Sequence, residues 1–214
     1  MNYNFGEIVE PPTRALIDEN LPITIDLEIP NSLVLPPNIN TLLIADTSYL
    51  SKLLKLCLVS EPMFSTKKNE LTFYKLNDHY IVVCKLIEGV SIGKATEILM
   101  PWINLSEVVY AMTTSPLATY QNKSDSNMLM LSTDGNTCYP TLQVPNLVTG
   151  VTAGVFSYAK HVGKSCSLFI GYIDNTPLDS VNSKPFVELL RKIDLPPVRE
   201  CVLQDRLPEH NLYM

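Results

Sequence analysis

A nearly uninterrupted apolar run, "SCSLFIGYID", occupies residues 165–174. A strand of this composition offers little polar surface, so it needs cover on both faces, as the central strands of α/β sheets have. Apolar residues recur at helical spacing before and after it, in "NLVTGVTAGVFSYAKHVG" (146–163) and "SVNSKPFVELLRKI" (180–193). Gly163 predicts the end of the first helix, and Pro185 suits the first turn of the second. The pattern predicts a buried strand between two helices.

Further strands and helices are predicted towards the N-terminus. The strands are "ITIDLEI" (23–29), "TLLIAD" (41–46), "SEVVYAM" (106–112), and a hairpin of 70–76 and 79–87 turning at Asn77 and Asp78. The helices are "YLSKLLKLC" (49–57), capped by Ser48, and "SIGKATEILMPWI" (91–103), which Pro101 interrupts. Residues 113–144 are polar and rich in turn formers, and no regular element is predicted there.

Strands alternating with helices predict the α/β class: a layered α/β/α sandwich with a mixed sheet flanked by helices and an extended C-terminal tail. The hairpin makes a purely parallel sheet improbable. With 214 residues, of which 46% are hydrophobic and 18% charged, the chain suits one folded domain. We expect an irregular N-terminal segment (1–22), a single α/β domain (23–193) and an extended arm (194–214).

Charge and the distribution of apolar residues exclude several partner classes. The formal charge is -6 and no Lys/Arg run forms a basic stripe, so we expect no nucleic-acid partner. No apolar run approaches the roughly 20 residues that span a bilayer, and the N-terminus does not resemble a signal peptide. We therefore expect no membrane partner and a location in the cytoplasm, with the nucleus as a second compartment.

The five cysteines are scattered singly, without a C-x-x-C pair. This argues against a disulfide framework and against a zinc site. Three of them, Cys57, Cys84 and Cys166, lie in apolar segments, so we expect them to be free, buried thiols. The three histidines are too far apart to suggest a metal site, and no metal or cofactor is expected.

The nearest approach to a catalytic motif is "GVSIGKAT" (89–96). A phosphate-binding loop requires G-x-x-x-x-G-K-[ST], but Gly89 is one residue too close to Gly93, and Ala95 replaces the hydroxyl residue. A strand-to-helix turn with Lys94 in solvent is the better interpretation. No G-x-S-x-G elbow occurs either. We expect no enzyme; the alternative is a small α/β hydrolase or nucleotide-binding enzyme whose site the motifs do not reveal.

The chain ends in an apolar residue, a tyrosine and a carboxylate. Pro196, Pro197 and Pro208 make the preceding arm extended and partly stiff. At its tip, Leu212 offers apolar surface, Tyr213 an amphipathic ring, and Met214 the terminal carboxylate, a combination that binding pockets capture. An unrelated interaction domain that ends this way by chance is a further alternative.

Three stretches resemble the proteasome assembly chaperone 1 family: "FGEIVEPPTRA" (5–15), "PNLVTGVTAGVFSYAKHVGKSCSLFIGYID" (145–174) and the terminal "NLYM" (211–214). They keep the family's order and relative placement, whereas residues 23–144 match only in pattern. The long acidic insertion of vertebrate members, which follows their N-terminal segment, is missing.

The resemblance implies an α/β protein that pairs with proteasome assembly chaperone 2. Together the two would promote formation of the α-subunit ring of the 20S core particle and prevent incorrect ring association. In this family the chain ends in a hydrophobic-tyrosine-any residue (HbYX) motif, which enters a pocket between proteasome α subunits. Leu212, Tyr213 and Met214 match that motif, and the Met214 carboxylate would meet a pocket lysine.

Overall fold

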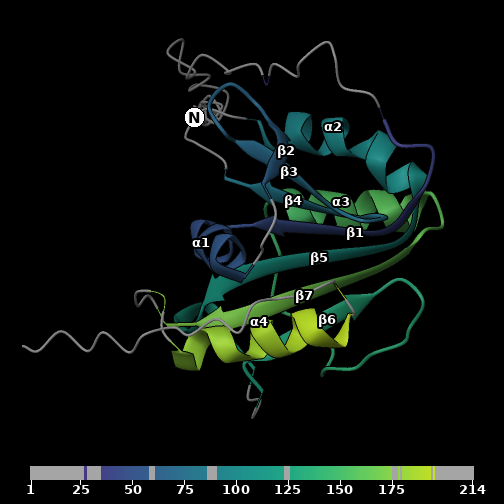
Figure 1. Cartoon of the computed structure of the whole chain (residues 1–214). Helices are drawn as coiled ribbons and strands as arrows, with labels where there is room; N and C mark the ends of the chain where they lie inside the picture. The colour runs from purple at the N-terminus through teal and green to yellow at the C-terminus, as the bar shows by residue number, and fades with distance from the viewer. Residues whose placement is uncertain are drawn as a thin grey trace, which may run out of the picture.

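The computed structural model describes residues 27, 35–57, 61–85, 91–122, 126–174, 178, 180–193 and 195. Its strands are β1 (Ile39–Asp46), β2 (Pro62–Ser65), β3 (Leu71–Leu76), β4 (His79–Cys84), β5 (Ser106–Pro116), β6 (Met128–Ser132) and β7 (Ser165–Ile173). Its helices are α1 (Ser48–Cys57), α2 (Ile92–Leu105), α3 (Val151–His161) and α4 (Ser180–Lys192), and a short 3-10 turn, η1 (Leu117–Thr119), follows β5 (Figure 1).

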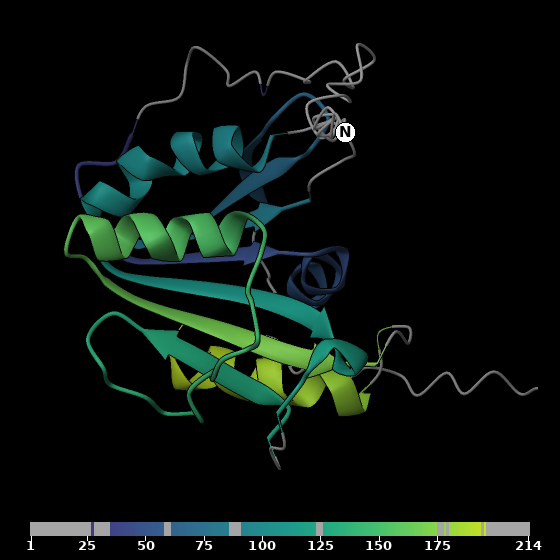
Figure 2. The same ribbon diagram turned by 180° about the vertical axis from the view of Figure 1, so that it is seen from behind.

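The strands form one mixed sheet in the order β2-β3-β4-β1-β5-β7-β6. The four central strands, β4-β1-β5-β7, run parallel to one another. The remaining pairs, β2-β3, β3-β4 and β6-β7, are antiparallel. The view from behind shows the long strands β5 and β7 crossing the middle of the molecule (Figure 2). The predicted mixed sheet is confirmed, and the apolar run at 165–174 is an interior strand.

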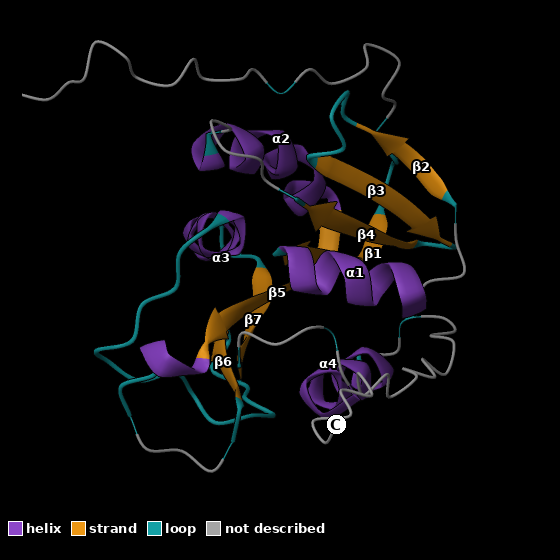
Figure 3. Ribbon diagram, turned by 90° about the vertical axis from the view of Figure 1, so that its left-hand side faces the viewer, coloured by secondary structure: helices purple, strands orange, loops and turns teal. Residues whose placement is uncertain are grey.

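Helices cover both faces of this sheet. Figure 3 shows α2 and α3 on one side and α1 and α4 on the other. The first pair buries Leu99, Trp102 and Val155 in one core cluster, and the second buries Leu53 and Phe186 in another. The predicted α/β/α sandwich is therefore confirmed.

The predicted hairpin is confirmed. Strands β3 and β4 pair from Leu71 opposite Cys84 to Leu76 opposite His79. Asn77 begins the two-residue turn with a φ of 56°, a conformation that Asn tolerates better than most residues. Strand β4 then pairs in parallel with β1, which joins the hairpin to the central sheet.

Pro101 does not interrupt its helix, contrary to the prediction. Helix α2 continues through Pro101 to Leu105. Proline removes one backbone donor from a helix interior, but Pro101 is exposed, so water can solvate the carbonyl group left without its donor. The next two residues, Trp102 and Ile103, are buried and hold the last turn against the sheet.

The helix predicted from residue 146 begins later, at Val151. Gly150 is the residue before the first helical residue, and its φ of 96° is not helical, so the helix does not extend further towards the N-terminus. Leu147, expected on the buried helix face, is instead 83% exposed. Gly163 adopts a φ of 70° just after the helix, and Lys164 N donates to Ala159 O at 2.9 Å, so the predicted glycine end is confirmed.

Three other predictions need correction. Thr47, not Ser48, caps α1: its Oγ1 accepts from Leu50 N at 3.4 Å, and threonine is also a preferred capping residue. Strands β2 and β6 were not predicted. Strand β6 has only five residues and lies within the polar, turn-rich region 113–144, so its sequence signal is weak. Cys57 is buried, as predicted, but it is disulfide-bonded and not free.

Several predicted segments fall outside the described residues. Of the strand predicted at 23–29, only Leu27 is described; it is buried in the α2/α3 core cluster and belongs to no strand. Of the arm at 194–214, only Leu195 is described, and it is buried in the α1/α4 cluster. The N-terminal segment 1–22 lies outside the described residues.

Candidate functional site

The carboxyl ends of β1, β4 and β5 meet at one edge of the sheet. Asp46 ends β1 and lies in register with Cys84, which ends β4. The chain leaves β1 for α1 on one face of the sheet, whereas the helix that follows β4, α2, lies on the other face. Adjacent parallel strands whose connections diverge in this way leave a crevice, and ligands of open α/β sheets bind at that point.

Two hollows occupy this edge. The larger, of about 390 Å³, is lined by Asp46–Ser48, Cys84 and Lys85, Thr113–Ser115 and Thr149–Val151. The smaller, of about 230 Å³, shares Thr47, Ser48, Thr114 and Ser115 with it and adds Lys52 and Asp174 among others. About half of the residues in each lining carry a hydroxyl group. The described lining residues of the two hollows include no histidine that could act as a general base for one of these hydroxyls.

Asp46 is one of the two charged residues among the described lining of the larger hollow, which we call the Asp46 crevice. It is only 7% exposed. Its Oδ2 accepts from Thr152 N at 3.0 Å and from Thr152 Oγ1 at 2.8 Å. Thr113 lies beside the carboxylate and favours its charged form, yet among the described residues no donor reaches Oδ1 in hydrogen-bonding geometry. One oxygen thus holds the start of α3, and the other lacks a partner.

Gly150 allows α3 to begin so close to this carboxylate. A Cβ at this position would lie 2.7 Å from Asp46 Oδ2, and the φ of 96° also disfavours a side chain. The sequence motif that could have indicated the site is Asp at the end of an apolar strand, but its partner lies more than 100 positions away, at Thr152.

Burial raises the pKa of Asp46 above its ordinary value of 3.8, while the hydroxyls of Thr113 and Thr152 and the amides of Thr152 and Val151 oppose that shift. A raised acid pKa means that the folded protein binds a proton that the unfolded chain releases. We therefore expect the free energy of unfolding to fall as pH rises from 3.8 through the folded-state pKa. The Asp46→Asn variant lacks this contribution.

Urea denaturation of both proteins across this acidic interval measures the difference. The wild type should lose stability relative to Asp46→Asn as pH rises. A relative gain would contradict the prediction, because it would mean that the donors of α3 outweigh desolvation.

Thr47 links the two hollows. It has a φ of 113°, which is rare and costly for a β-branched residue. Its Oγ1 accepts from Thr114 Oγ1 at 3.1 Å, in addition to capping α1. The strained backbone is therefore held by hydrogen bonds from both neighbouring elements.

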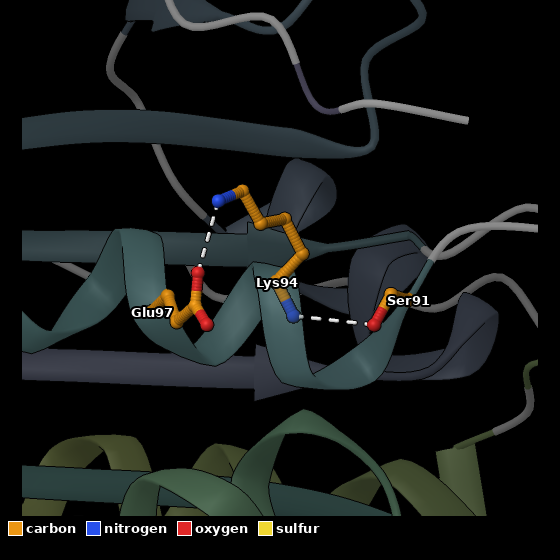
Figure 4. Close-up of polar contacts among 3 residues, drawn as sticks. All are labelled: Ser91, Lys94 and Glu97. Atoms are coloured by element: carbon orange, nitrogen blue, oxygen red, sulfur yellow. Dashed lines mark hydrogen bonds and ion pairs between the residues drawn. The ribbon is translucent and has the colours of Figure 1, made fainter. Parts of the chain in front are cut away.

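The "GVSIGKAT" segment forms no phosphate loop within its described part, 91–96. Ser91 caps α2 by accepting from Lys94 N at 3.3 Å, and Gly93 already lies in the helix. Lys94 pairs with Glu97 at 2.9 Å, with side chains 50% and 58% exposed (Figure 4). The predicted exposed lysine at a helix start is confirmed.

A second surface feature is the 143–147 loop, which precedes α3. Val144 is 87% exposed and Leu147 is 83% exposed. The buried Asn146 side chain between them donates to Gln143 O at 2.7 Å and to Asn122 Oδ1, and its Oδ1 accepts from the amide of Gln121. The loop is therefore braced by hydrogen bonds while it presents two aliphatic side chains to solvent.

The predicted partner-binding residues Leu212, Tyr213 and Met214 lie outside the described residues. Within the described ranges, no group of three or more His, Cys, Asp or Glu side chains could hold a metal ion. None of the described helices combines the length and apolar character needed to cross a membrane.

Comparison with known proteins identifies similar folds. No protein-family profile matches the sequence, and no curated protein sequence is significantly similar to it. Pyrococcus furiosus PbaA, an archaeal homolog of proteasome-assembly chaperone, superposes with a TM-score of 0.54 at 15% identity, over 75% of this chain and 84% of PbaA. A Thermoplasma acidophilum protein of unknown function gives 0.54 at 13% identity, over 78% and 80% of the chains. A Corynebacterium glutamicum protein of unknown function gives 0.51 at 14%, over 79% and 81%.

Proposed function

We propose that this protein is a non-enzymatic chaperone for assembly of the 20S proteasome core particle. It acts as a heterodimer with proteasome assembly chaperone 2, promotes formation of the α-subunit ring and prevents off-pathway ring association. The observation that carries the proposal is the fold likeness to PbaA, an archaeal homolog of proteasome-assembly chaperone. The finer parts of the proposal, the second chaperone and the α-subunit ring, are what the sequence resemblance at 5–15, 145–174 and 211–214 implies.

The C-terminal tail is the proposed anchor on the α subunits. Burial of Leu212 and Tyr213 would contribute roughly 2 kcal/mol each, and a charge-assisted hydrogen bond to the Met214 carboxylate roughly 1.5–3 kcal/mol. Ordering about five residues of the arm costs roughly 1–2 kcal/mol per residue. Because these contributions nearly cancel, the tail supplies register and specificity, while the folded body or the second chaperone supplies most of the affinity.

The 143–147 loop is the proposed contact of the body with the second chaperone. Permanent interfaces are more apolar than transient ones, and exposed apolar groups mark them. Val144 and Leu147 are almost fully exposed on a hydrogen-bonded loop, so they would reach a partner without a large ordering cost.

Deleting Leu212–Met214 should reduce capture of proteasome α subunits from cell extract by about tenfold or more, as loss of one charged contact predicts. The fold and the second chaperone should be retained. Capture is measured by affinity purification and mass spectrometry, with circular dichroism as the test of folding. Tyr213→Ala should act like the deletion. Met214→Ala, which keeps the carboxylate and changes only the variable position, should bind normally.

The full-length chain also tests the proposed function itself. If it captures neither α subunits nor a second chaperone, the function is wrong. If the deletion variant unfolds, the tail is part of the core and not an anchor.

Replacing both Val144 and Leu147 by Ser should remove the second chaperone from the captured proteins. Each aliphatic side chain buried at an interface contributes about 1.5–3 kcal/mol. Val181→Ser on α4 is the matched control, because Val181 is 79% exposed on another part of the surface. Equal recovery of the second chaperone with the loop variant and with this control would place the heterodimer contact elsewhere.

A further inference from the structure

We propose that Cys57 and Cys201 form a disulfide that fastens the C-terminal arm to the end of α1 and opens in a reducing environment. The inference concerns the covalent state of the chain and does not depend on the proposed chaperone function. It assigns a redox-sensitive link between α1 and the segment that precedes Leu212–Met214.

The cysteines of the chain leave one partner for Cys57. Cys57 is disulfide-bonded, whereas Cys84, Cys138 and Cys166 are free. The one remaining cysteine of the sequence is Cys201. It lies outside the described residues, so we assign the pairing by elimination.

The beginning of the arm supports this pairing. Cys57 ends α1 and is fully buried in the α1/α4 cluster. Leu195 is buried in the same cluster. The arm therefore starts in the part of the core to which Cys57 belongs. Residues 196–201, which lead from there to Cys201, span at most about 20 Å when extended, and a disulfide requires the two Cα atoms to lie roughly 4.4–6.8 Å apart.

The bond forms in two thiol–disulfide exchange steps. The Cys201 thiolate attacks one sulfur of a small disulfide, such as oxidised glutathione, and releases the first glutathione thiolate. The Cys57 thiolate then attacks the Cys201 sulfur and releases the second. The two cysteines thus lose two protons and two electrons, and the small disulfide becomes two thiols. Because Cys57 is fully buried, the small disulfide reacts at Cys201. Two glutathione thiols reverse the reaction, so the link opens in a compartment that glutathione keeps reducing.

The link changes how far the tail can extend from the body. With the bond closed, residues 202–214 carry Leu212–Met214 and span at most about 45 Å. With the bond open, residues 196–214 extend from Leu195 and span at most about 65 Å. Oxidation therefore shortens the reach of the tail.

The link also encloses most of the fold in one covalent loop. Strands β2–β7 and helices α2–α4 all lie between Cys57 and Cys201 in the sequence. A disulfide that closes so long a loop restricts the unfolded chain and thereby favours the folded one. The stability of the protein should therefore depend on its redox state.

Peptide mapping of the full chain tests the pairing. The purified protein is equilibrated with oxidised glutathione, free thiols are alkylated in denaturant, and the protein is digested with trypsin without reduction. We expect peptide 56–67 joined to peptide 200–206, and the three free cysteines outside any disulfide between peptides. An alkyl label on Cys57, a bond from Cys57 to another cysteine, or a covalent dimer would overturn the proposal.

The Cys201→Ser variant measures the effect of the link without altering the buried Cys57 side chain. In the oxidised state, the Tm of this variant should be about 5–10 °C lower than that of the wild type, the shift expected for loss of a disulfide that closes a long loop. In the reduced state, the two Tm values should agree. Cys138→Ser is the matched control, because Cys138 is exposed and free and its replacement should leave the Tm unchanged in both states. Equal Tm values for the oxidised wild type and oxidised Cys201→Ser would contradict the link.

Discussion

Replacing Trp102 by Ala is expected to lower the free energy of unfolding by about 3–5 kcal/mol, the usual cost of deleting a buried large aromatic side chain. Trp102 is 1% exposed. Its ring centroid lies 4.9 Å from that of Phe73, 5.4 Å from that of Tyr80 and 6.2 Å from that of Phe64. The side chain therefore joins α2 to β2, β3 and β4. Urea denaturation monitored by circular dichroism measures the change.

The preceding residue provides the control. Pro101→Ala restores a backbone donor at an exposed helix position and should raise the free energy of unfolding by about 1–3 kcal/mol, since the roughly 3 kcal/mol helix cost of proline is partly offset by its stiffer unfolded chain. The two neighbouring substitutions should thus have opposite signs. A loss below about 1 kcal/mol for Trp102→Ala would mean that this aromatic cluster is not closely packed.

Gly171→Ala is expected to destabilise the protein by about 3 kcal/mol, at the upper end of the cost of overpacking a core. Gly171 lies in β7, and a Cβ there would overlap the ring of Phe186 from α4. Phe186 is 1% exposed and packs with the apolar residues of α1. The hollow beside it and Gly171 has a volume of only about 30 Å³, which is too small to take the displaced ring. Thermal and urea denaturation measure the loss.

Two further variants assign that loss to the contact. Gly93→Ala is the matched control, because its Cβ would make only an ordinary contact of 3.6 Å with Ser91 Oγ in the first turn of α2, and alanine favours helix by about 1 kcal/mol. Adding Phe186→Leu to Gly171→Ala should recover part of the stability, a non-additive effect expected of neighbours. Strict additivity would show that the two residues do not interact.

Most of the elements could be predicted because their signals are local. The helical spacing of Leu50, Leu53 and Leu54, the Asn77 turn and the apolar run at 165–174 each depend on neighbours within a few residues. The errors arose where distant groups override a local preference. Pro101 stays helical because the residues after it are held in the core. Residues 146–150 stay outside α3, where Asn146 bonds to residues more than 20 positions earlier.

The candidate sites divide in the same way. The proposed anchor at Leu212–Met214 rests on three consecutive residues of the sequence, because a motif of this kind depends on adjacent side chains. The Asp46 crevice could not be found by that route. Asp46, Lys85, Thr113 and Thr149 come from four separate segments, and no spacing along the chain encodes their convergence.

By itself, the sequence determined the α/β class, the mixed sheet and the short ending that suggests a partner. These follow from composition and from periodicities that a few consecutive residues impose on the backbone. Only the tertiary structure decided the strand order, the place where the connections of β1 and β4 diverge, and the partnerless oxygen of Asp46. Such features depend on which segments meet after folding, and burial and hydrogen bonding at that meeting are properties of the packed chain, not of any one segment.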